Sequence, residues 1–523
     1  MSGKNQNDDK RYGANRFRRA LVHFIGGRVV QAVSRALLIL LVVRVLQVED
    51  YGAYMLIVGV AEMLPLIASL GTISVVQRYV PQVAERSDRR TLVRFIVSVS
   101  GIQMSLMLLV SLAIWVYWPS LAGWVKFSEA QIQATRLTAA LCFLIPTRRF
   151  LEEIMDALLE QGKSQISRAM MPLGRVVVLG SVLAFDMPID LAFIMAVEVW
   201  VTVFCWFLAV YFLANAVREF DGQGTAPIPV REIVSFSWLM AGANLLYAAA
   251  YPGVFRLAIT NVLGLAETGL FAFLQSVERL VSRNLPGTLL RGVVRPVMVA
   301  KAQAPGGMVA VEAGAWFLMK MNVAITLGGC IVVATAGDEM MMLLSGGKFP
   351  GAGLTLLMFL AVLTIAAQRS VIEMVLQITG QTKTLRTTAM LTPIGVVLAW
   401  YFARYGLNAA IGAIVVTAFT ANALSVRAIR HGDKQIKFVW GDYVRIGVPA
   451  IAAAAAGYGL ALAMNVYLAA AIALVIFTAG LAVAKPFQHR ELSLLERGVG
   501  KKVARLMRRF SRETNLPAQE HAT

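Results

Sequence analysis

An apolar segment at residues 24–46 constrains the fold most, because it carries polar side chains at a depth where they are costly. The segment is long enough to cross a hydrocarbon layer of roughly 30 Å as one helix. Arg28, Gln31 and Arg35 follow at steps of three and four, which places them on one helix face. Arg35 lies roughly 16 Å into the segment at about 1.5 Å per residue. A charge so near the midplane indicates a functional site, whereas Arg28 is equally compatible with a side chain that only reaches the headgroups.

The composition excludes an ordinary soluble protein. Of the 523 residues, 58% are hydrophobic and 15% are charged, whereas soluble domains have roughly 25% charged residues. The net charge of +19 does not indicate nucleic-acid binding, because the basic residues lie between apolar segments. We therefore predict a multi-pass membrane protein.

The apolar segments predict the fold class. It is an all-α polytopic membrane protein with about 14 transmembrane helices, arranged as two pseudo-symmetric six-helix lobes plus two C-terminal helices. The predicted spans are residues 24–46, 53–75, 95–118, 134–157, 170–186, 190–214, 234–260, 267–289, 314–336, 353–378, 386–404, 407–426, 446–465 and 467–485.

The positions of the basic residues predict the topology. Most of the 49 lysines and arginines fall in the two tails and in alternate loops, and few fall in the remaining loops. Because cytoplasmic loops are enriched in Lys and Arg, both tails are predicted to be cytoplasmic. The outer loops are short, and nothing outside the membrane has the size of a domain.

An internal repeat predicts two lobes with the same orientation. The segment RVLQVEDYGAY at 44–54 matches NVLGLAETGLF at 261–271, an offset of 217, and QGKS at 161–164 matches TGQT at 379–382, an offset of 218. The predicted parts are a basic N-tail (1–23), an N-lobe (24–214), a cytoplasmic linker (215–233), a C-lobe (234–426), two further helices (446–485) and a basic tail (486–523).

Several enzyme and metal motifs are excluded. The stretch ALLEQGKS at 157–164 resembles a phosphate-binding loop, but it lacks the first glycine and no strand precedes it. The histidines and cysteines form no ligand cluster, so we predict no metal site. A membrane polymerase or ligase of surface polysaccharides would need a large outer loop with catalytic residues. The chain has none, and we predict that it is not an enzyme.

The connecting motifs resemble one membrane-protein family. They are RVLQVEDYGAY after the first span, SLGTISVVQRYVPQ at 69–82, VLGLAETGLFAF at 262–273 and LLSGGKFPGAGLTLL at 343–357. Together they look like the polysaccharide transport flippases of surface O-antigen and exopolysaccharide synthesis. These belong to the superfamily that also contains lipid II flippases and the multidrug and toxin extrusion (MATE) antiporters.

The resemblance implies a V-shaped, two-lobed bundle in the bacterial inner membrane. Its implied function is to flip an undecaprenyl-pyrophosphate-linked oligosaccharide to the outer leaflet by alternating access, for lipopolysaccharide or exopolysaccharide synthesis. The implied partners are this substrate, the lipid bilayer and a polysaccharide polymerase or other assembly proteins. No cofactor is expected, although a proton or sodium gradient is a possible driving force.

An anionic pyrophosphate in a low dielectric favours arginine, which stays ionised and offers forked donors to phosphate oxygens. The predicted substrate-binding residues are Arg28, Gln31, Arg35, Arg256 and Lys320. At position 256 many members of the family have an acidic residue, so no carboxylate role is transferred there. The predicted ion-coupling residues are the intramembrane carboxylates Glu62 and Glu198. Glu62 lies at nearly the depth of Arg35, and the two are predicted to pair, either for coupling or as a fixed structural contact.

Two alternatives remain open at this point. A MATE-like antiporter of small cationic molecules would use Glu62 and Glu198 rather than the arginines. A non-transporting scaffold for a polysaccharide assembly complex would need no charged cavity.

Overall fold

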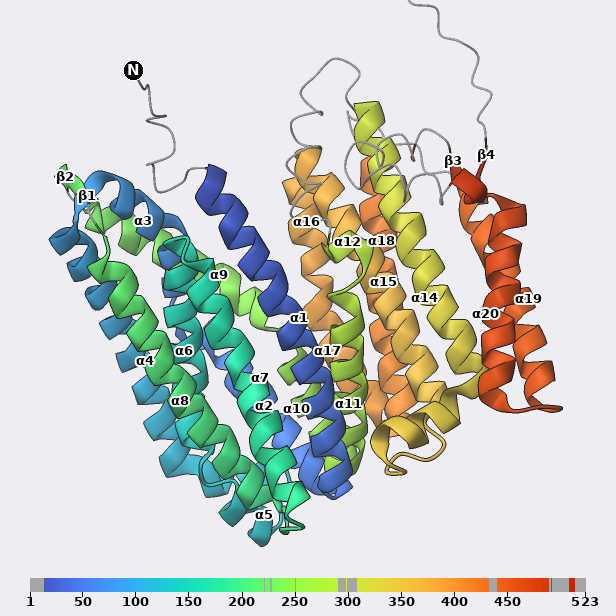
Figure 1. Ribbon diagram of the computed structural model, residues 1–523, viewed down its shortest axis with the longest axis horizontal. Helices are drawn as coiled ribbons and strands as arrows, with labels where there is room; N and C mark the ends of the chain where they lie inside the picture. Colours follow the sequence, from blue (N-terminus) through green and yellow to red (C-terminus); the bar gives the residue numbers. More distant parts are fainter. Residues whose placement is uncertain are drawn as a thin grey trace, which may run out of the picture. The chain divides into compact units, whose positions relative to one another are not determined.

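The computed structural model confirms the predicted all-α membrane class (Figure 1). It describes residues 14–220, 222–225, 228–249, 251–289, 298, 308–431, 440–488, 491 and 508–512. The chain divides into two compact units, Met1–Phe273 and Leu274–Thr523. This division falls inside a helix rather than in the predicted linker at 215–233. The assignment of lobes and linker therefore stays a prediction.

Ten helical segments among the described residues are long and apolar enough to cross a membrane, and all ten correspond to predicted spans. They are Val48–Ala68, Arg89–Trp124, Gln161–Ala184, Leu191–Arg218, Val311–Ser345, Gly353–Ile378, Lys383–Tyr405, Leu407–His431, Trp440–Ala461 and Val466–Ala484. The other four predicted spans, at 24–46, 134–157, 234–260 and 267–289, also fall largely on helices.

The N-terminal unit is built from long helices joined by short turns. The helices are α1 (Ala14–Val45), α2 (Val48–Ala68), α3 (Thr72–Arg86), α4 (Arg89–Trp124), α5 (Glu129–Ala134), α6 (Thr138–Ala157), α7 (Gln161–Ala184), α8 (Leu191–Arg218), α9 (Val230–Ala249), α10 (Pro252–Leu263) and the first half of α11 (Leu265–Ser282). In Figure 1, α3 lies at the end where α1 begins, and α5 lies at the opposite end.

Local chemistry explains the turn between α3 and α4. The side chain of Asp88 caps α4 by accepting a hydrogen bond from the backbone N–H of Thr91 at 3.0 Å. Hydrogen bonds from Thr91 lower the pKa of the Asp88 carboxyl. Strand β1 (Ser87–Asp88) in this turn pairs antiparallel with β2 (Gln223–Thr225), which lies between α8 and α9. Part of the predicted linker is therefore attached to the α3–α4 turn.

The predicted span at 234–260 is two helices rather than one. Tyr251 is extended and caps α10, whose first residue is Pro252. Proline has no backbone N–H and disfavours a helical conformation at the residue before it, so the helix is interrupted here.

Helix α1 packs along α7, and the two run in the same direction. A side chain on Gly27 would meet Gln165, and one turn later Gln31 Nε2 donates to the backbone oxygen of Arg168 at 3.5 Å. The polar face of α1 is therefore directed at α7 at the level of Gln31.

The C-terminal unit has its own helical core. Its elements are the second half of α11, α12 (Pro286–Leu289), α14 (Met308–Ser345), α15 (Gly353–Ile378), α16 (Thr382–Ala389), α17 (Leu391–Phe402), the 3₁₀ turn η1 (Ala403–Tyr405), α18 (Leu407–His431), α19 (Trp440–Ala461), α20 (Val466–Ala484), β3 (Phe487–Gln488), η2 (Arg508–Phe510) and β4 (Ser511–Arg512). Strands β3 and β4 pair in parallel at the end of α20 (Figure 1).

Each unit contains the same helix–turn–helix corner. The turn from α6 to α7 has Leu159 in the left-handed region (φ 60°), and the turn from α15 to α16 has Gly380 there (φ 79°). At the two corners, Glu160 N–H donates to the oxygen of Met155 and Gln381 N–H donates to that of Leu376, both at 2.9 Å. Structurally equivalent residues here are 221 positions apart, three more than the offset of 218 that the sequence match indicates.

Candidate functional site

A buried ion pair lies at the centre of the charged residues of the N-terminal unit. Glu198 of α8 pairs with Arg175 of α7, with 2.5 Å between Oε1 and Nη2. The hydroxyl of Tyr54 of α2 donates to Glu198 Oε2 at 3.2 Å. The Glu198 side chain is 2% exposed. Three helices are thus connected through one carboxylate.

A second set of charges connects α6 to α7. Arg148 pairs with Glu152 one turn along α6. Glu152 also accepts a hydrogen bond from Ser167 at 2.7 Å and lies 3.4 Å from Arg168. Arg168 in turn lies 2.6 Å from Asp156. Removing one partner of a buried ion pair typically costs 3–5 kcal/mol, so this network is a strong constraint on the packing of α6 and α7.

The spacing of the sequence explains how this network forms. Arg148, Glu152 and Asp156 are four residues apart and lie on one face of α6. On α7, Arg168 and Arg175 are seven residues apart and also share a face. The two charged faces meet across the α6–α7 corner.

A third polar contact lies where α10 begins. The hydroxyl of Tyr251 donates to Glu62 Oε2 of α2 at 3.2 Å. Arg149 of α6 hydrogen-bonds Tyr251 and interacts electrostatically with Glu62. Glu62 and Tyr251 are half-buried, whereas Arg149 is exposed. The interruption before Pro252 thus lies beside the charge of Arg149.

The structure places the predicted ion-coupling and α1 residues as follows. Glu198 and Glu62 both belong to the polar contacts of the N-terminal unit. Gln31 contacts α7, and Arg35 is half-buried. The side chain of Arg28 lies outside the described residues. The pairing of Arg35 with Glu62 stays a prediction.

Arg256 lies between α10 and α2. Its side chain is buried, and Nη1 donates to the backbone oxygen of Met55 at 2.6 Å. The helices approach closely because Gly59 and Gly253 face each other. Arg256 therefore has a structural contact inside the N-terminal unit, and its predicted role in substrate binding stays untested.

Lys320 lies in the C-terminal unit and is fully buried. Its Nζ faces three acceptors, which are Asp442 Oδ2 at 2.5 Å, Glu491 Oε1 at 2.7 Å and the oxygen of Pro486 at 3.0 Å. A substrate phosphate would have to displace one of them. We do not include Lys320 in the proposed substrate path.

Sequence reasoning missed five charged residues of these contacts. Arg148, Arg168 and Arg175 fall near the predicted cytoplasmic ends of spans, where basic residues indicate topology. Glu152 and Asp156 were not singled out. The signal that identifies them is the arginine and glutamate one turn apart inside the apolar run of residues 138–157.

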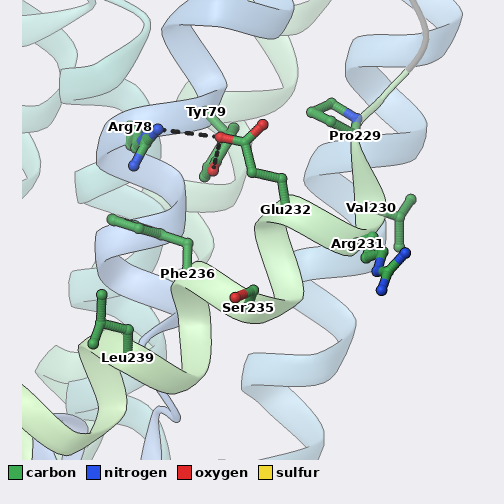
Figure 2. Close-up of a pocket in the computed structure, with 9 residues that line it drawn as sticks. All are labelled: Arg78, Tyr79, Pro229, Val230, Arg231, Glu232, Ser235, Phe236 and Leu239. Atoms are coloured by element: carbon green, nitrogen blue, oxygen red, sulfur yellow. Dashed lines mark hydrogen bonds and ion pairs between the residues drawn. The ribbon is translucent and has the colours of Figure 1, made fainter.

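Two pockets lie at the ends of the N-terminal unit. One, of about 740 Å³, lies between α3 and the start of α9 (Figure 2). There the Arg78 guanidinium stacks over Phe236, 4.6 Å from the ring centre, and pairs with Glu232 at 3.1 Å. The other, of about 720 Å³, surrounds the hydrogen bond from Gln131 to Asp50, which is 2.9 Å long. Neither includes the buried ion pairs.

The described residues contain no group of three or more His, Cys, Asp or Glu side chains that could hold a metal ion. The candidate site of the N-terminal unit is assembled from paired charges and hydroxyl groups.

Comparison with known proteins shows the fold. No protein-family model matches the sequence, and no curated protein matches it. The structure of the lipid II flippase MurJ in an inward closed conformation matches with a TM-score of 0.67 and 12% identity, over 88% of this chain and 98% of that chain. An inward-facing MATE family multidrug resistance transporter of the MOP superfamily matches with a TM-score of 0.57 and 13% identity, over 76% and 92% of the two chains.

At these identities the likeness concerns the fold alone. The chain shares its fold with these two structures. Its finer assignment to the polysaccharide transport flippases stays a prediction.

Proposed function

We propose that this protein is a flippase that moves an undecaprenyl-pyrophosphate-linked oligosaccharide across the cytoplasmic membrane by alternating access. The observation that carries the proposal is the position of the α1 stripe. Gln31, in the middle of the stripe, contacts α7 at Arg168, and Arg168 belongs to the charged network of α6 and α7. The α1 stripe thus meets the charged network at Gln31, and Arg35 follows one turn later on the same helix face.

The chemistry of the substrate fits this arrangement. A pyrophosphate group brings negative charge into a region of low dielectric, where it needs permanent positive partners. Arg28 and Arg35 lie about 10 Å apart along α1, with Gln31 between them as an uncharged hydrogen-bond partner. The phosphates can exchange one arginine for the next along this path. The lipid tail remains in the bilayer and requires no polar site.

Two of the solved structures with this fold support transport of this kind. One is named a lipid II flippase and the other a multidrug resistance transporter. Both names describe a protein that moves a molecule across a membrane. We extend this activity class to the present chain, with a lipid-linked saccharide as its substrate.

The proposal includes a coupling role for the two carboxylates. Glu62 is half-buried and accepts from Tyr251. Glu198 is buried and depends on Arg175 for its charge balance. When a carboxylate in this setting loses its partner, it must bind a proton or a cation. We propose that such exchange couples transport to an ion gradient.

Reconstitution into vesicles tests the proposal. The purified protein is placed in liposomes with a fluorescent undecaprenyl-pyrophosphate-linked oligosaccharide, and a membrane-impermeant quencher reports the fraction in the outer leaflet. We expect the protein to increase the accessible fraction. The proposal would be overturned in favour of an antiporter if the protein moved no lipid-linked saccharide but exported a cationic dye in exchange for an ion that enters down its gradient.

The antiporter remains the second candidate function because of one observation. Glu62, Tyr251 and Arg149 form a polar contact that includes an exposed charge and a half-buried carboxylate. Glu62→Gln separates the two candidates. It should abolish proton-driven dye export in an antiporter, whereas a flippase should retain downhill movement of the lipid-linked saccharide.

A further inference from the structure

Residues 487–488, 491 and 508–512 lie against the helices of the C-terminal unit. Lys485 ends α20 in the left-handed region (φ 44°), and Pro486 prevents the helix from continuing. Residues 487–488 form β3, which pairs with β4 at 511–512. Phe487 is 2% exposed, and Phe510 packs partly buried against the same apolar cluster. We call residues 508–512 the strap.

Four charges hold the strap in place. Lys320 of α14 pairs with Asp442 of α19 at 2.5 Å and with Glu491 at 2.7 Å. The other Asp442 oxygen, Oδ1, lies 2.7 Å from Arg512 of the strap. Two positive and two negative side chains therefore balance, and three of them are almost completely removed from solvent.

Burial within this cluster is uneven. The side chains of Lys320, Asp442 and Glu491 are 0%, 1% and 3% exposed, whereas that of Arg512 is 26% exposed. The strap itself is held by a two-residue strand, one ion pair and the partial burial of Phe510. The strap is thus the member of this assembly that can leave without exposing a large apolar surface.

The strap also carries two arginines that do not pair with Asp442. Arg508 and Arg509 are exposed on the 3₁₀ turn that precedes β4. Clusters of arginine next to a membrane are attracted to anionic headgroups within about one Debye length. The strap can therefore bind either of two anionic partners, the Asp442 carboxylate or an anionic lipid surface.

We infer that the strap docks reversibly on Asp442 and that anionic lipid headgroups compete with Asp442 for it. Release leaves Lys320 paired with Asp442 and Glu491, which gives the buried cluster a net negative charge and loosens the contact of α14 with α19. The packing of α19 and α20 thereby responds to the lipid composition beside them. This inference does not depend on the proposed transport function.

Thiol labelling of the full-length protein tests the inference. The three native cysteines are replaced by serine, and Ser511→Cys places one thiol on the half-buried strand β4. Nanodiscs contain phosphatidylcholine alone or phosphatidylcholine with phosphatidylglycerol, and the rate of reaction with a maleimide is measured. We expect labelling to be several-fold faster in the anionic membrane. A Thr387→Cys variant, exposed on α16, controls for the effect of lipid charge on the reagent.

Two further variants separate docking from lipid attraction. Asp442→Asn removes the docking charge and should make labelling fast in both membranes, and Arg512→Gln should do the same if Asp442→Asn does not fold. Arg508→Gln/Arg509→Gln leaves Asp442 and Arg512 intact, so labelling should stay slow in both. Equal rates in the two membranes for the Ser511→Cys protein would overturn the inference. Fast labelling in phosphatidylcholine with added inorganic phosphate at matched ionic strength would do so as well, because it would assign release to free anions rather than to a lipid surface.

Discussion

Gly253 of α10 lies against Gly59 of α2 so closely that a Cβ atom on Gly253 would be 2.6 Å from the Gly59 carbonyl oxygen. A second close contact of α2 lies at the start of α11, where a Cβ on Gly52 would meet the carbonyl oxygen of Leu265 at 2.0 Å. Both contacts are to backbone atoms, which cannot rotate away. The absence of side chains at these positions is what lets α10 approach α2 and brings Tyr251 to Glu62.

Gly253→Val should therefore prevent the close approach of α10 and α2. Overpacking of this kind costs typically 1–3 kcal/mol. The measurement is the thermal unfolding temperature of the purified protein in detergent, together with flipping activity. Gly101→Val on α4 is the matched control, since a Cβ there meets nothing within 4 Å. Equal unfolding temperatures for the two variants would show that α10 and α2 can move apart without loss of stability.

The contact between Arg148 and Glu152 predicts a second stability effect. Arg148→Gln leaves Glu152 buried with Ser167 and Arg168 as remaining partners. We expect a loss at the lower end of the roughly 3–5 kcal/mol that breaking a buried pair costs. The solvent-accessible pairs of Lys163 with Glu219 and Glu160 provide the control, and Lys163→Gln should change stability by less than about 1 kcal/mol. Chemical denaturation of both variants makes the comparison. Similar losses would contradict the burial argument.

Substitutions at Arg35 test the substrate path. Lysine keeps the charge but loses the forked geometry, and glutamine loses both. Flipping at equal membrane abundance should therefore decrease from wild type to Arg35→Lys and again to Arg35→Gln. The decisive variant is Arg28→Gln/Arg35→Gln. If this double variant flips the lipid-linked saccharide as fast as wild type, the arginines of α1 do not bind the pyrophosphate of the substrate.

The two equivalent corners predict opposite effects of related substitutions. Leu159 adopts a left-handed conformation that costs a non-glycine residue roughly 1–2 kcal/mol. Leu159→Gly should thus stabilise the α6–α7 corner or leave it unchanged, after the entropy cost of glycine is subtracted. Gly380→Ala at the equivalent position should destabilise by about 1 kcal/mol. Unfolding temperatures that move in the same direction would contradict the equivalence.

Cysteine labelling of Gln223 tests the predicted topology. Gln223 lies in β2 and pairs with the turn before α4, which the basic residues place on the cytoplasmic side. In intact cells, a membrane-impermeant reagent should leave Gln223→Cys unmodified until the membrane is permeabilised. Labelling from outside would reverse the orientation of every span.

The sequence predicted features that depend on local pattern. The apolar length of the spans predicted the helices. The spacing of Gln31 predicted a polar face on α1, and at Gln31 this face contacts α7. Glu198 lies in a buried ion pair, and its predicted coupling role stays a prediction. These signals repeat within a few residues and need no knowledge of distant contacts.

The features that the sequence analysis missed depend on contacts between residues far apart in the sequence, or on residues whose pattern allows two interpretations. Arg148 was interpreted as a topology marker because it lies near the cytoplasmic end of its span. The interruption before Pro252 was overlooked within an apolar run. The partners of Lys320 are separated from it in sequence by more than 100 residues, for example Glu491 at 171. No periodic pattern connects such positions.

The burial of Lys320 also sets an order of assembly. Lys320 is synthesised before Asp442, Glu491 and Arg512, so α14 enters the membrane while the partners that neutralise its charge do not yet exist. Domains generally fold from the N-terminus during synthesis, but the charge of Lys320 is balanced only after Asp442 and Glu491 have been made. A ribosome stalled before residue 442 therefore holds a chain with an uncompensated lysine.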